Sequence, residues 1–261
     1  MAFRDGTEVC RGVSDMYRFF IDKSQLADGK AVITGEDVRH IRQVLRMRKG
    51  EKILISCGDE WEYTCSIDSI ESERVTALVE DAAKPGKELP SRIWLLQCLP
   101  KGDKMETVIQ KAVELGAAGI VPVSSKRCVV KLDERRGIQK VNRWNSIAES
   151  AAKQSKRLVI PEVTRIMTMK EALEFAAGLD VRLIPYEVEK GISATRELLS
   201  GITPGQSIAI LIGPEGGFEP AEVEQAREAG FSPITLGKRI LRTETAGMTV
   251  LSVLMYLLEQ D

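Results

Sequence analysis

The alternation of apolar runs with amphipathic segments after residue 91 constrains the fold of this chain more than any other sequence feature. Residues 93–99 read IWLLQCL and residues 208–212 read IAILI, which is typical of strands buried on both faces of a sheet. Residues 103–115 and 142–157 place apolar side chains at helical spacing. The alternation predicts an α/β domain with a mostly parallel sheet over residues 91–261.

The N-terminal part has the pattern of a small β-domain. Residues 52–57, 61–67 and 74–79 are strand-like, and the second segment alternates Trp61, Tyr63, Cys65 and Ile67 with polar residues. Short strands at this spacing predict a small barrel over residues 16–83. Residues 84–90 read KPGKELP and predict a linker.

Charge is distributed unevenly along the chain. Residues 101–157 carry 13 Lys and Arg against 6 Asp and Glu, a net charge of +7 in a chain whose total is −1. A second basic cluster lies within residues 39–52. Such patches attract phosphates. For either cluster alone, a solvated helix face is an equally good interpretation.

The counts of cysteine, histidine and apolar residues exclude several classes of protein. The five cysteines are odd in number and form no CxxC pair, which favours a reduced cytoplasm over a disulfide scaffold or a zinc finger. His40 is the only histidine, so His dyads and multi-His metal sites are excluded, and we expect no metal. No apolar run of about 18 residues is present, and residues 1–12 contain no apolar segment of the kind found in secretory signals. We therefore expect neither a secretory signal nor membrane contact.

Two loops that follow strand-like segments are notable for their glycine residues or their cations. Residues 213–218 read GPEGGF, and residues 236–246 read LGKRILRTETA, with Thr243 as the expected N-cap of a helix. Neither loop matches GxGxxG or GxxxxGK[ST]. Binding of a nicotinamide cofactor and binding of phosphate by a P-loop are therefore both poorly supported. Lys238, Arg239 and Arg242 lie beside a helix start, where cations are unfavourable. We therefore expect an anion to offset them: Glu244, Glu215 or an RNA phosphate.

The helix expected at the C-terminal end is unusually apolar. Residues 246–258 read AGMTVLSVLMYLL, so nearly every side of the helix must be covered. It is either a central core helix or, as we slightly prefer, a helix with one face against a partner subunit.

The two loops together resemble the knotted SPOUT methyltransferases, and among them the RsmE type. The resemblance extends over residues 16–260, and the motifs follow in the expected order. They are Arg18-Phe19-Phe20, His40-x-x-x-Val44-Leu45-Arg46, Lys101-Gly102-Asp103-Lys104-Met105, Gln110-Lys111, Glu114-Leu115-Gly116, Glu149, Gln154-Ser155-x-Arg157 and Pro161. Because members of this type usually begin near Met16, the resemblance implies that residues 1–15 are an extension, or follow from an upstream start codon, and have no function.

The resemblance implies an S-adenosylmethionine-dependent enzyme that methylates N3 of one uridine in the 16S ribosomal RNA of the small ribosomal subunit. It also implies a PUA-like N-terminal barrel, a SPOUT domain with a deep trefoil knot, and a homodimer. The implied cofactor-binding residues are Leu183, Ile184, Pro185, Ile212, Gly213, Pro214, Glu215, Gly216, Gly217, Leu236, Gly237, Ile240, Leu241 and Ala246.

Methylation of uracil N3 requires help with removal of its proton, because the protonated nitrogen is a weak nucleophile. Glu215 is the candidate to accept the proton or orient the base, and Arg242 is the candidate to stabilise charge on the uracil carbonyls. A loop carboxylate that bonds backbone amides or pairs with Arg242 is an equally weighted alternative for Glu215. The candidates to position RNA are Arg18, Arg39, Arg42, Arg46, Arg48, Lys126, Arg127, Lys131, Arg135, Arg136, Lys153 and Arg157.

Two other functions remain open at this point. One is a related SPOUT enzyme that methylates ribose 2′-hydroxyls or transfer RNA. The other is a ribosome-assembly factor that binds RNA without catalysis, against which the intact glycine loop argues.

Overall fold

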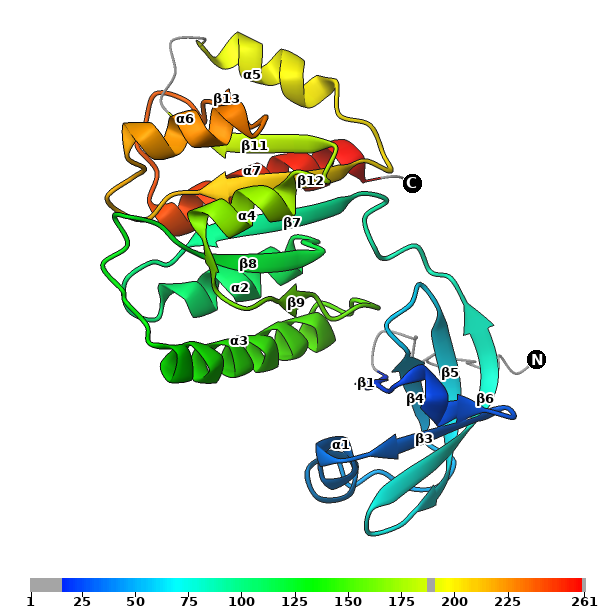
Figure 1. Cartoon of the computed structure of the whole chain (residues 1–261). Coiled ribbons are helices and arrows are strands. Elements are labelled where there is room, and N and C mark those ends of the chain that lie inside the picture. Colours follow the sequence, from blue (N-terminus) through cyan, green and yellow to red (C-terminus); the bar gives the residue numbers. More distant parts are fainter. Residues whose placement is uncertain (1–15, 187–190, 260–261) are drawn as a thin grey trace, which may run out of the picture. The chain divides into compact units, whose positions relative to one another are not determined.

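The computed structural model describes residues 16–186 and 191–259. The chain divides into two compact units, and the boundary along the sequence lies between Gly86 and Lys87 (Figure 1). Residues 1–15, for which we expect no function, lie outside the described residues.

The first unit is a curled six-stranded sheet with the order β1-β4-β5-β6-β3-β2. Strand β1 runs parallel to β4, and the other neighbours are antiparallel. A short helix, α1 (Glu36–Arg39), and a single π-helical turn (His40–Val44) follow β3. The strands are β1 (Arg18–Phe20), β2 (Leu26–Ala27), β3 (Lys30–Thr34), β4 (Lys52–Ser56), β5 (Glu62–Ile70) and β6 (Arg74–Ala83).

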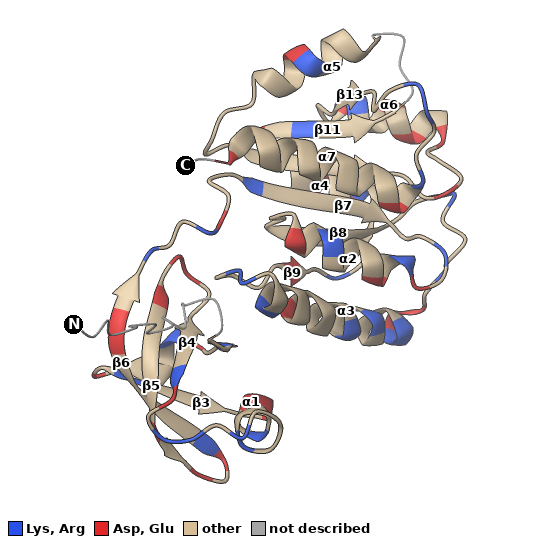
Figure 2. Cartoon of the chain, turned by 180° about the vertical axis from the view of Figure 1, so that it is seen from behind, with Lys and Arg blue, Asp and Glu red and all other residues tan. Residues whose placement is uncertain are grey.

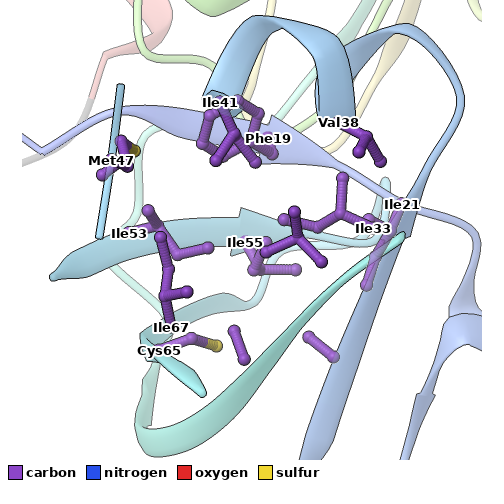
Figure 3. Close-up of a cluster of buried hydrophobic side chains, with 13 residues drawn as sticks. Phe19, Ile21, Ile33, Val38, Ile41, Met47, Ile53, Ile55, Cys65 and Ile67 are labelled. Carbon is purple, nitrogen blue, oxygen red and sulfur yellow. The ribbon is translucent and has the colours of Figure 1, made fainter. Parts of the chain in front are cut away.

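The core of the first unit lies inside the curl of this sheet. Phe19, Ile33, Ile41, Ile53 and Ile55 point toward one another there and are almost completely buried (Figure 3). Burying a side chain of this kind stabilises a fold by roughly 1.5–3 kcal/mol. The alternating pattern expected for residues 61–67 therefore arises because one face of β5 covers this core.

The second unit is a seven-stranded sheet in which every pair of neighbours is parallel. Its main order is β10-β8-β7-β12-β11-β13, and β9 pairs with β8. The strands are β7 (Arg92–Cys98), β8 (Gly119–Ser124), β9 (Glu162–Val163), β10 (Met167–Thr168), β11 (Val181–Pro185), β12 (Ser207–Ile212) and β13 (Ser232–Ile234). The predicted α/β fold with a mostly parallel sheet and a small N-terminal β-domain is confirmed.

Helices cover both faces of this sheet. Helices α2 and α7 lie on one face and α4 on the other (Figures 1 and 2). The helices are α2 (Lys104–Glu114), α3 (Glu134–Gln154), α4 (Met169–Ala176), α5 (Gly191–Ser200), α6 (Pro220–Glu228) and α7 (Thr243–Leu258). Helix α3 begins eight residues before the predicted start at Asn142, because the Asp133 side chain caps it by accepting from the Arg136 amide over 2.8 Å.

Two arginines with predicted RNA contacts are instead buried in ion pairs, one in each unit. Arg18 pairs with Glu62, and only 3% of its side chain is exposed. Arg157 pairs with Glu88 and donates to the carbonyl oxygens of Val113 and Ala117. The prediction of RNA contacts is therefore corrected for both residues, because each guanidinium is buried inside its own unit and paired with a carboxylate there.

Candidate cofactor pocket and active site

A pocket of about 710 Å³ lies beyond the carboxyl ends of β11, β12 and β13. This is the edge where parallel α/β sheets bind their ligands, and the volume falls in the range of small-molecule sites. The predicted cofactor-binding and catalytic residues that line it are Pro185, Ile212, Gly213, Pro214, Glu215, Gly217, Leu236, Gly237, Ile240, Leu241, Arg242 and Ala246. The structure thus brings together residues that are up to 61 positions apart in the chain.

Three residues from the predicted cofactor set do not line the pocket. Leu183 and Ile184 are fully buried in β11 and support the pocket from within the sheet. Gly216 faces Arg127, whose Cβ would lie 3.5 Å from a side chain added at Gly216. These three residues therefore contribute to the shape of the pocket walls.

The loop after β12 is tied to the start of α7. The Thr243 hydroxyl donates to the Gly213 carbonyl over 2.5 Å, and the buried Gln97 amide donates to the Thr243 oxygen over 2.8 Å. Arg242, rather than the predicted Thr243, is the N-cap residue of α7. Thr243 is the first residue of the helix, and its side chain bonds the neighbouring loop instead of its own helix.

The second loop, between β13 and α7, turns through Gly237 at a φ of +105°. Only glycine adopts such a conformation without strain. Ile240 extends from this loop with 93% of its surface exposed and lines the pocket, as do the half-buried Leu236 and Leu241. The loop therefore offers apolar side chains to a ligand.

Glu215 is held by α2 and the residues just before it. Its Oε1 atom accepts from the Lys101 amide and from Lys104 Nζ, each over 3.0 Å. Lys104 Nζ also lies 3.5 Å from Glu244 Oε2 at the start of α7. Partial burial opposes ionisation, but hydrogen bonds from the Glu215 and Lys101 amides and from Lys104 outweigh it and lower the pKa of Glu215. Glu215 is therefore an ionised hydrogen-bond acceptor at neutral pH.

Arg239 and Arg242 line the same pocket and are exposed. Among the described residues, neither has a carboxylate within 4 Å, because Glu215 and Glu244 both pair with Lys104. Of the three anions named as alternatives for offsetting the cations of the second loop, Glu215 and Glu244 thus do not pair with them, and Glu215 bonds a backbone amide as its alternative role required. Lys104 is the residue that sequence reasoning missed. Its place in the Lys101–Met105 motif was the available signal.

The turn after β8 adds a third wall. Arg127 lines the pocket and donates to the Gly216 carbonyl over 3.0 Å. The Lys126 amide donates to Glu222 Oε1 over 2.9 Å, and Glu222 is almost completely buried at the start of α6. These contacts join the turn after β8 to the loop after β12 and to the start of α6.

The exposed RNA-contact candidates form one group in each unit. Arg39, Arg42, Arg46 and Arg48 are exposed on α1 and the residues after it. In the second unit, Lys126, Arg127, Lys131, Arg135 and Arg136 are exposed between β8 and the first turn of α3, where Figure 2 shows a run of Lys and Arg. Lys153 is half-buried and pairs with Glu149 over 2.9 Å.

The described residues contain no group of three or more His, Cys, Asp and Glu side chains that is placed to hold a metal ion. None of the helices over residues 16–186 and 191–259 combines the length and the hydropathy needed to cross a bilayer.

Comparison with known proteins identifies the family. Residues 87–255 match the RNA methyltransferase domain, and residues 33–80 match the RNA methyltransferase PUA domain. The ribosomal RNA small subunit methyltransferase E of Bacillus subtilis (strain 168) is 38% identical over 247 residues, which cover 92% of this chain and 96% of the relative. The protein of that name from Mesomycoplasma hyopneumoniae (strain 232) is 33% identical, with 91% and 98% covered.

Solved structures give the same relationship. A ribosomal RNA small subunit methyltransferase E from Neisseria gonorrhoeae, bound to S-adenosyl methionine, aligns with a TM-score of 0.80 and 35% identity over 93% of this chain and 98% of that one. A putative methyltransferase from Legionella pneumophila, in complex with the cofactor SAM, aligns with a TM-score of 0.81 and 32% identity over 92% and 97%. The chain belongs to the RNA methyltransferase family that includes ribosomal RNA small subunit methyltransferase E.

Proposed function

We propose that this protein transfers the methyl group of S-adenosylmethionine to N3 of one specific uridine in the 16S ribosomal RNA of the small ribosomal subunit. One observation carries the proposal: the glycine loop, the Leu236–Leu241 stretch and the end of β11 converge on a single pocket of suitable volume in a chain of this family. The cysteine pattern favours action in the reduced cytoplasm.

The residues of the pocket fit S-adenosylmethionine. Ile240, Leu241 and Ala246 supply apolar surface for the adenine ring, and the backbone groups of Leu236 and Leu241 are the hydrogen-bonding partners that we assign to its edge. Gly213 and Gly217 let the chain pass close to the bound molecule, since neither carries a side chain. When bound, the cofactor supplies an electrophilic methyl group on a sulfonium.

Glu215 and Arg242 are the residues that we assign to the target base. Glu215 remains ionised, and its hydrogen bonds to the Lys101 amide and to Lys104 both fall on Oε1. Its Oε2 atom is the acceptor that we assign to the uracil N3 proton. Arg242 lines the pocket and has no carboxylate partner among the described residues. Its charge stabilises the uracil oxygens as N3 loses the proton.

We assign the positioning of RNA to the two exposed groups of cations. Phosphate contacts fix register and make affinity depend steeply on salt. The target base must leave its stack to reach the pocket. The candidates are Arg39, Arg42, Arg46, Arg48, Lys126, Arg127, Lys131, Arg135 and Arg136.

We propose that the protein acts as a homodimer through α7. Val250, Leu251 and Leu254 bury one side of this helix in the core of the second unit. The helix also exposes 82% of Tyr256, 44% of Leu257 and 39% of Val253. An apolar patch of this kind is typical of a contact with a second copy.

A methyl-transfer assay with labelled S-adenosylmethionine tests the proposed function. Small ribosomal subunits that lack N3-methyluridine, naked 16S ribosomal RNA and transfer RNA serve as alternative substrates. We expect label in the small subunit and none in transfer RNA. Label in transfer RNA alone would favour the transfer-RNA relatives, and cofactor binding without any transfer would favour a non-catalytic assembly factor.

A further inference from the structure

Two thiols of the second unit lie side by side at the carboxyl ends of β7 and β8. Cys98 ends β7 and is in register with Val123 of β8. Cys128 lies in the turn after β8, and its Sγ atom lies 3.8 Å from the Val123 carbonyl oxygen. The turn therefore folds Cys128 back over the end of its own strand, and the two thiols share a hydrogen bond.

Burial and hydrogen bonds shift the pKa values of the two thiols in opposite directions. The Ser125 amide lies 3.4 Å from Cys128 Sγ, and the Ser125 hydroxyl lies 3.2 Å from it. The hydrogen bond from Cys98 outweighs burial and, with those from Ser125, lowers the pKa of Cys128 to about 6. Burial raises the pKa of Cys98. Cys128 is therefore the sulfur of the pair that loses its proton more readily, and the thiolate is the reactive form of cysteine.

The turn that carries Cys128 also supports the pocket. Arg127 donates to the Gly216 carbonyl, and the Lys126 amide donates to Glu222. Cys128 is 6% exposed, but its neighbour Val129 is 66% exposed, so the turn is at the surface. A covalent change at Cys128 would therefore be transmitted directly to the wall formed by Arg127 and Gly216.

We propose that Cys98 and Cys128 are a redox-sensitive pair that a hydroperoxide converts into a disulfide, with the loop around Gly216 loosened as a result. The Cys128 thiolate attacks one peroxide oxygen, the O–O bond breaks, and hydroxide leaves and takes a proton from solvent. The Cys98 sulfur then loses its proton and attacks the sulfenic sulfur of Cys128, whose S–O bond breaks to release water. With hydrogen peroxide, two thiols are oxidised and one peroxide is reduced to two water molecules.

Peptide mapping tests the site without reference to the function. The full chain is treated with hydrogen peroxide, unfolded in iodoacetamide and cut with trypsin. Residues 93–101 (IWLLQCLPK) and 128–131 (CVVK) are separate tryptic peptides, and we expect to find them joined. The Cys98→Ser and Cys128→Ser variants lose the joined species, whereas Cys57→Ser, which alters the half-buried thiol of the first unit, keeps it. Recovery of both peptides fully alkylated from the treated wild-type chain would overturn the proposal.

The effect on the pocket rests on the proposed function and is measured by S-adenosylmethionine binding. We expect oxidised wild-type protein to bind at least about fivefold more weakly than reduced protein, with recovery in dithiothreitol and no loss on peroxide treatment of Cys128→Ser, which lacks the sulfur that is oxidised first. Unchanged binding by the disulfide form would overturn the coupling. Failure of the reduced chain to bind at all would instead contradict the proposed function and leave the peptide result standing.

Discussion

Lys104 Nζ lies 3.0 Å from Glu215 Oε1 and so joins α2 to the loop that follows β12. The same ammonium group lies 3.5 Å from Glu244 at the start of α7, and these contacts raise its own pKa, the hydrogen bond to Glu215 being the largest cause. Lys104 therefore pairs with both carboxylates of the site, and within the described part of the chain neither Arg239 nor Arg242 has a carboxylate partner in the pocket.

The first prediction concerns the acid limb of the pH profile, where activity falls as pH is lowered. Because the pKa of Glu215 is lowered, the ionised form persists below the ordinary value of 4.5, and activity falls only as pH drops through the lowered value. Lys104→Met removes a cation that lowers this pKa, so we expect the acid limb to move to higher pH. The pH profile of kcat/KM measures the shift. Lys111→Met, on the same helix but paired with Glu114, is the control, and an unmoved limb in Lys104→Met would contradict the assignment.

The second prediction concerns Arg242. We expect Arg242→Met to lower kcat by about 10²–10³-fold, the loss found when one group that stabilises developing charge is removed. Affinity for S-adenosylmethionine should change little, because the guanidinium acts on the base. Single-turnover methylation and cofactor titration separate the two effects. Lys238→Met removes a nearby exposed cation that does not line the pocket, and an equal loss of kcat in that variant would show that the effect is one of general charge.

The third prediction uses two glycines of the site. Gly237 has a φ of +105°, so Gly237→Ala places an L residue in a strained conformation that costs roughly 1–3 kcal/mol. At Gly216 an added Cβ meets Arg127 at an ordinary contact distance of 3.5 Å. We expect the first variant to weaken cofactor binding and the second to bind nearly as well as the wild type. Calorimetric titration of both compares them, and equal affinities would show that the Gly237 turn does not shape the pocket.

The fourth prediction separates structure from RNA binding at Arg157. Its side chain is 7% exposed and pairs with Glu88, which also accepts from the Leu158 amide over 2.8 Å. Removing one partner of a buried pair typically costs about 3–5 kcal/mol, so we expect Arg157→Met to lower the free energy of unfolding by that amount. Urea denaturation measures it, with the exposed Arg135→Met as control. Stability equal to that of the control would return Arg157 to the RNA-binding candidates.

The fifth prediction concerns the start of α4. Hydrogen bonds from the Thr168 amide, Arg165 and the Thr168 hydroxyl lower the pKa of Glu171 to about 2. A carboxyl whose pKa is lowered in the folded state stabilises the fold above its unfolded pKa, and this contribution is lost as pH falls from about 4.5 to about 2.

Glu171→Gln should therefore lose part of the stability at neutral pH and show a flatter dependence on pH across that window. Thermal unfolding at several pH values measures the slope. Glu174→Gln, one turn later and 3.8 Å from Lys170, provides the comparison. Parallel curves for Glu171→Gln and the wild type would contradict the prediction.

The sheet of the second unit was predictable because its central strands are continuous apolar runs. Residues 93–99 and 208–212 lie next to each other as β7 and β12, buried as expected. The edge strands β9 and β10 have two residues each, too few to produce a period. Helix α3 was predicted too short because its first two turns carry charge rather than an apolar stripe.

The two loops that line the pocket could be picked out from the sequence, whereas the ion pairs around them could be predicted only in part. Glycines at the ends of buried strands indicated both loops, which line one pocket. Sequence spacing did not indicate that Lys104, 111 positions from Glu215, is the cation that pairs with it. Likewise, Arg157 is buried whereas the remaining arginine candidates of the second unit are exposed, and the sequence alone does not show this difference. The trefoil knot stays a prediction from the family resemblance, because alternation of strand and helix does not specify how the chain threads.

The identity of the methylated nucleoside tests the central claim most directly. Small ribosomal subunits lacking N3-methyluridine are incubated with the protein and S-adenosylmethionine, their RNA is digested, and the nucleosides are identified by mass spectrometry. The account predicts that N3-methyluridine appears with the wild-type protein and is strongly reduced with Arg242→Met. A ribose-methylated nucleoside, or N3-methyluridine at equal rates with both proteins, would contradict it.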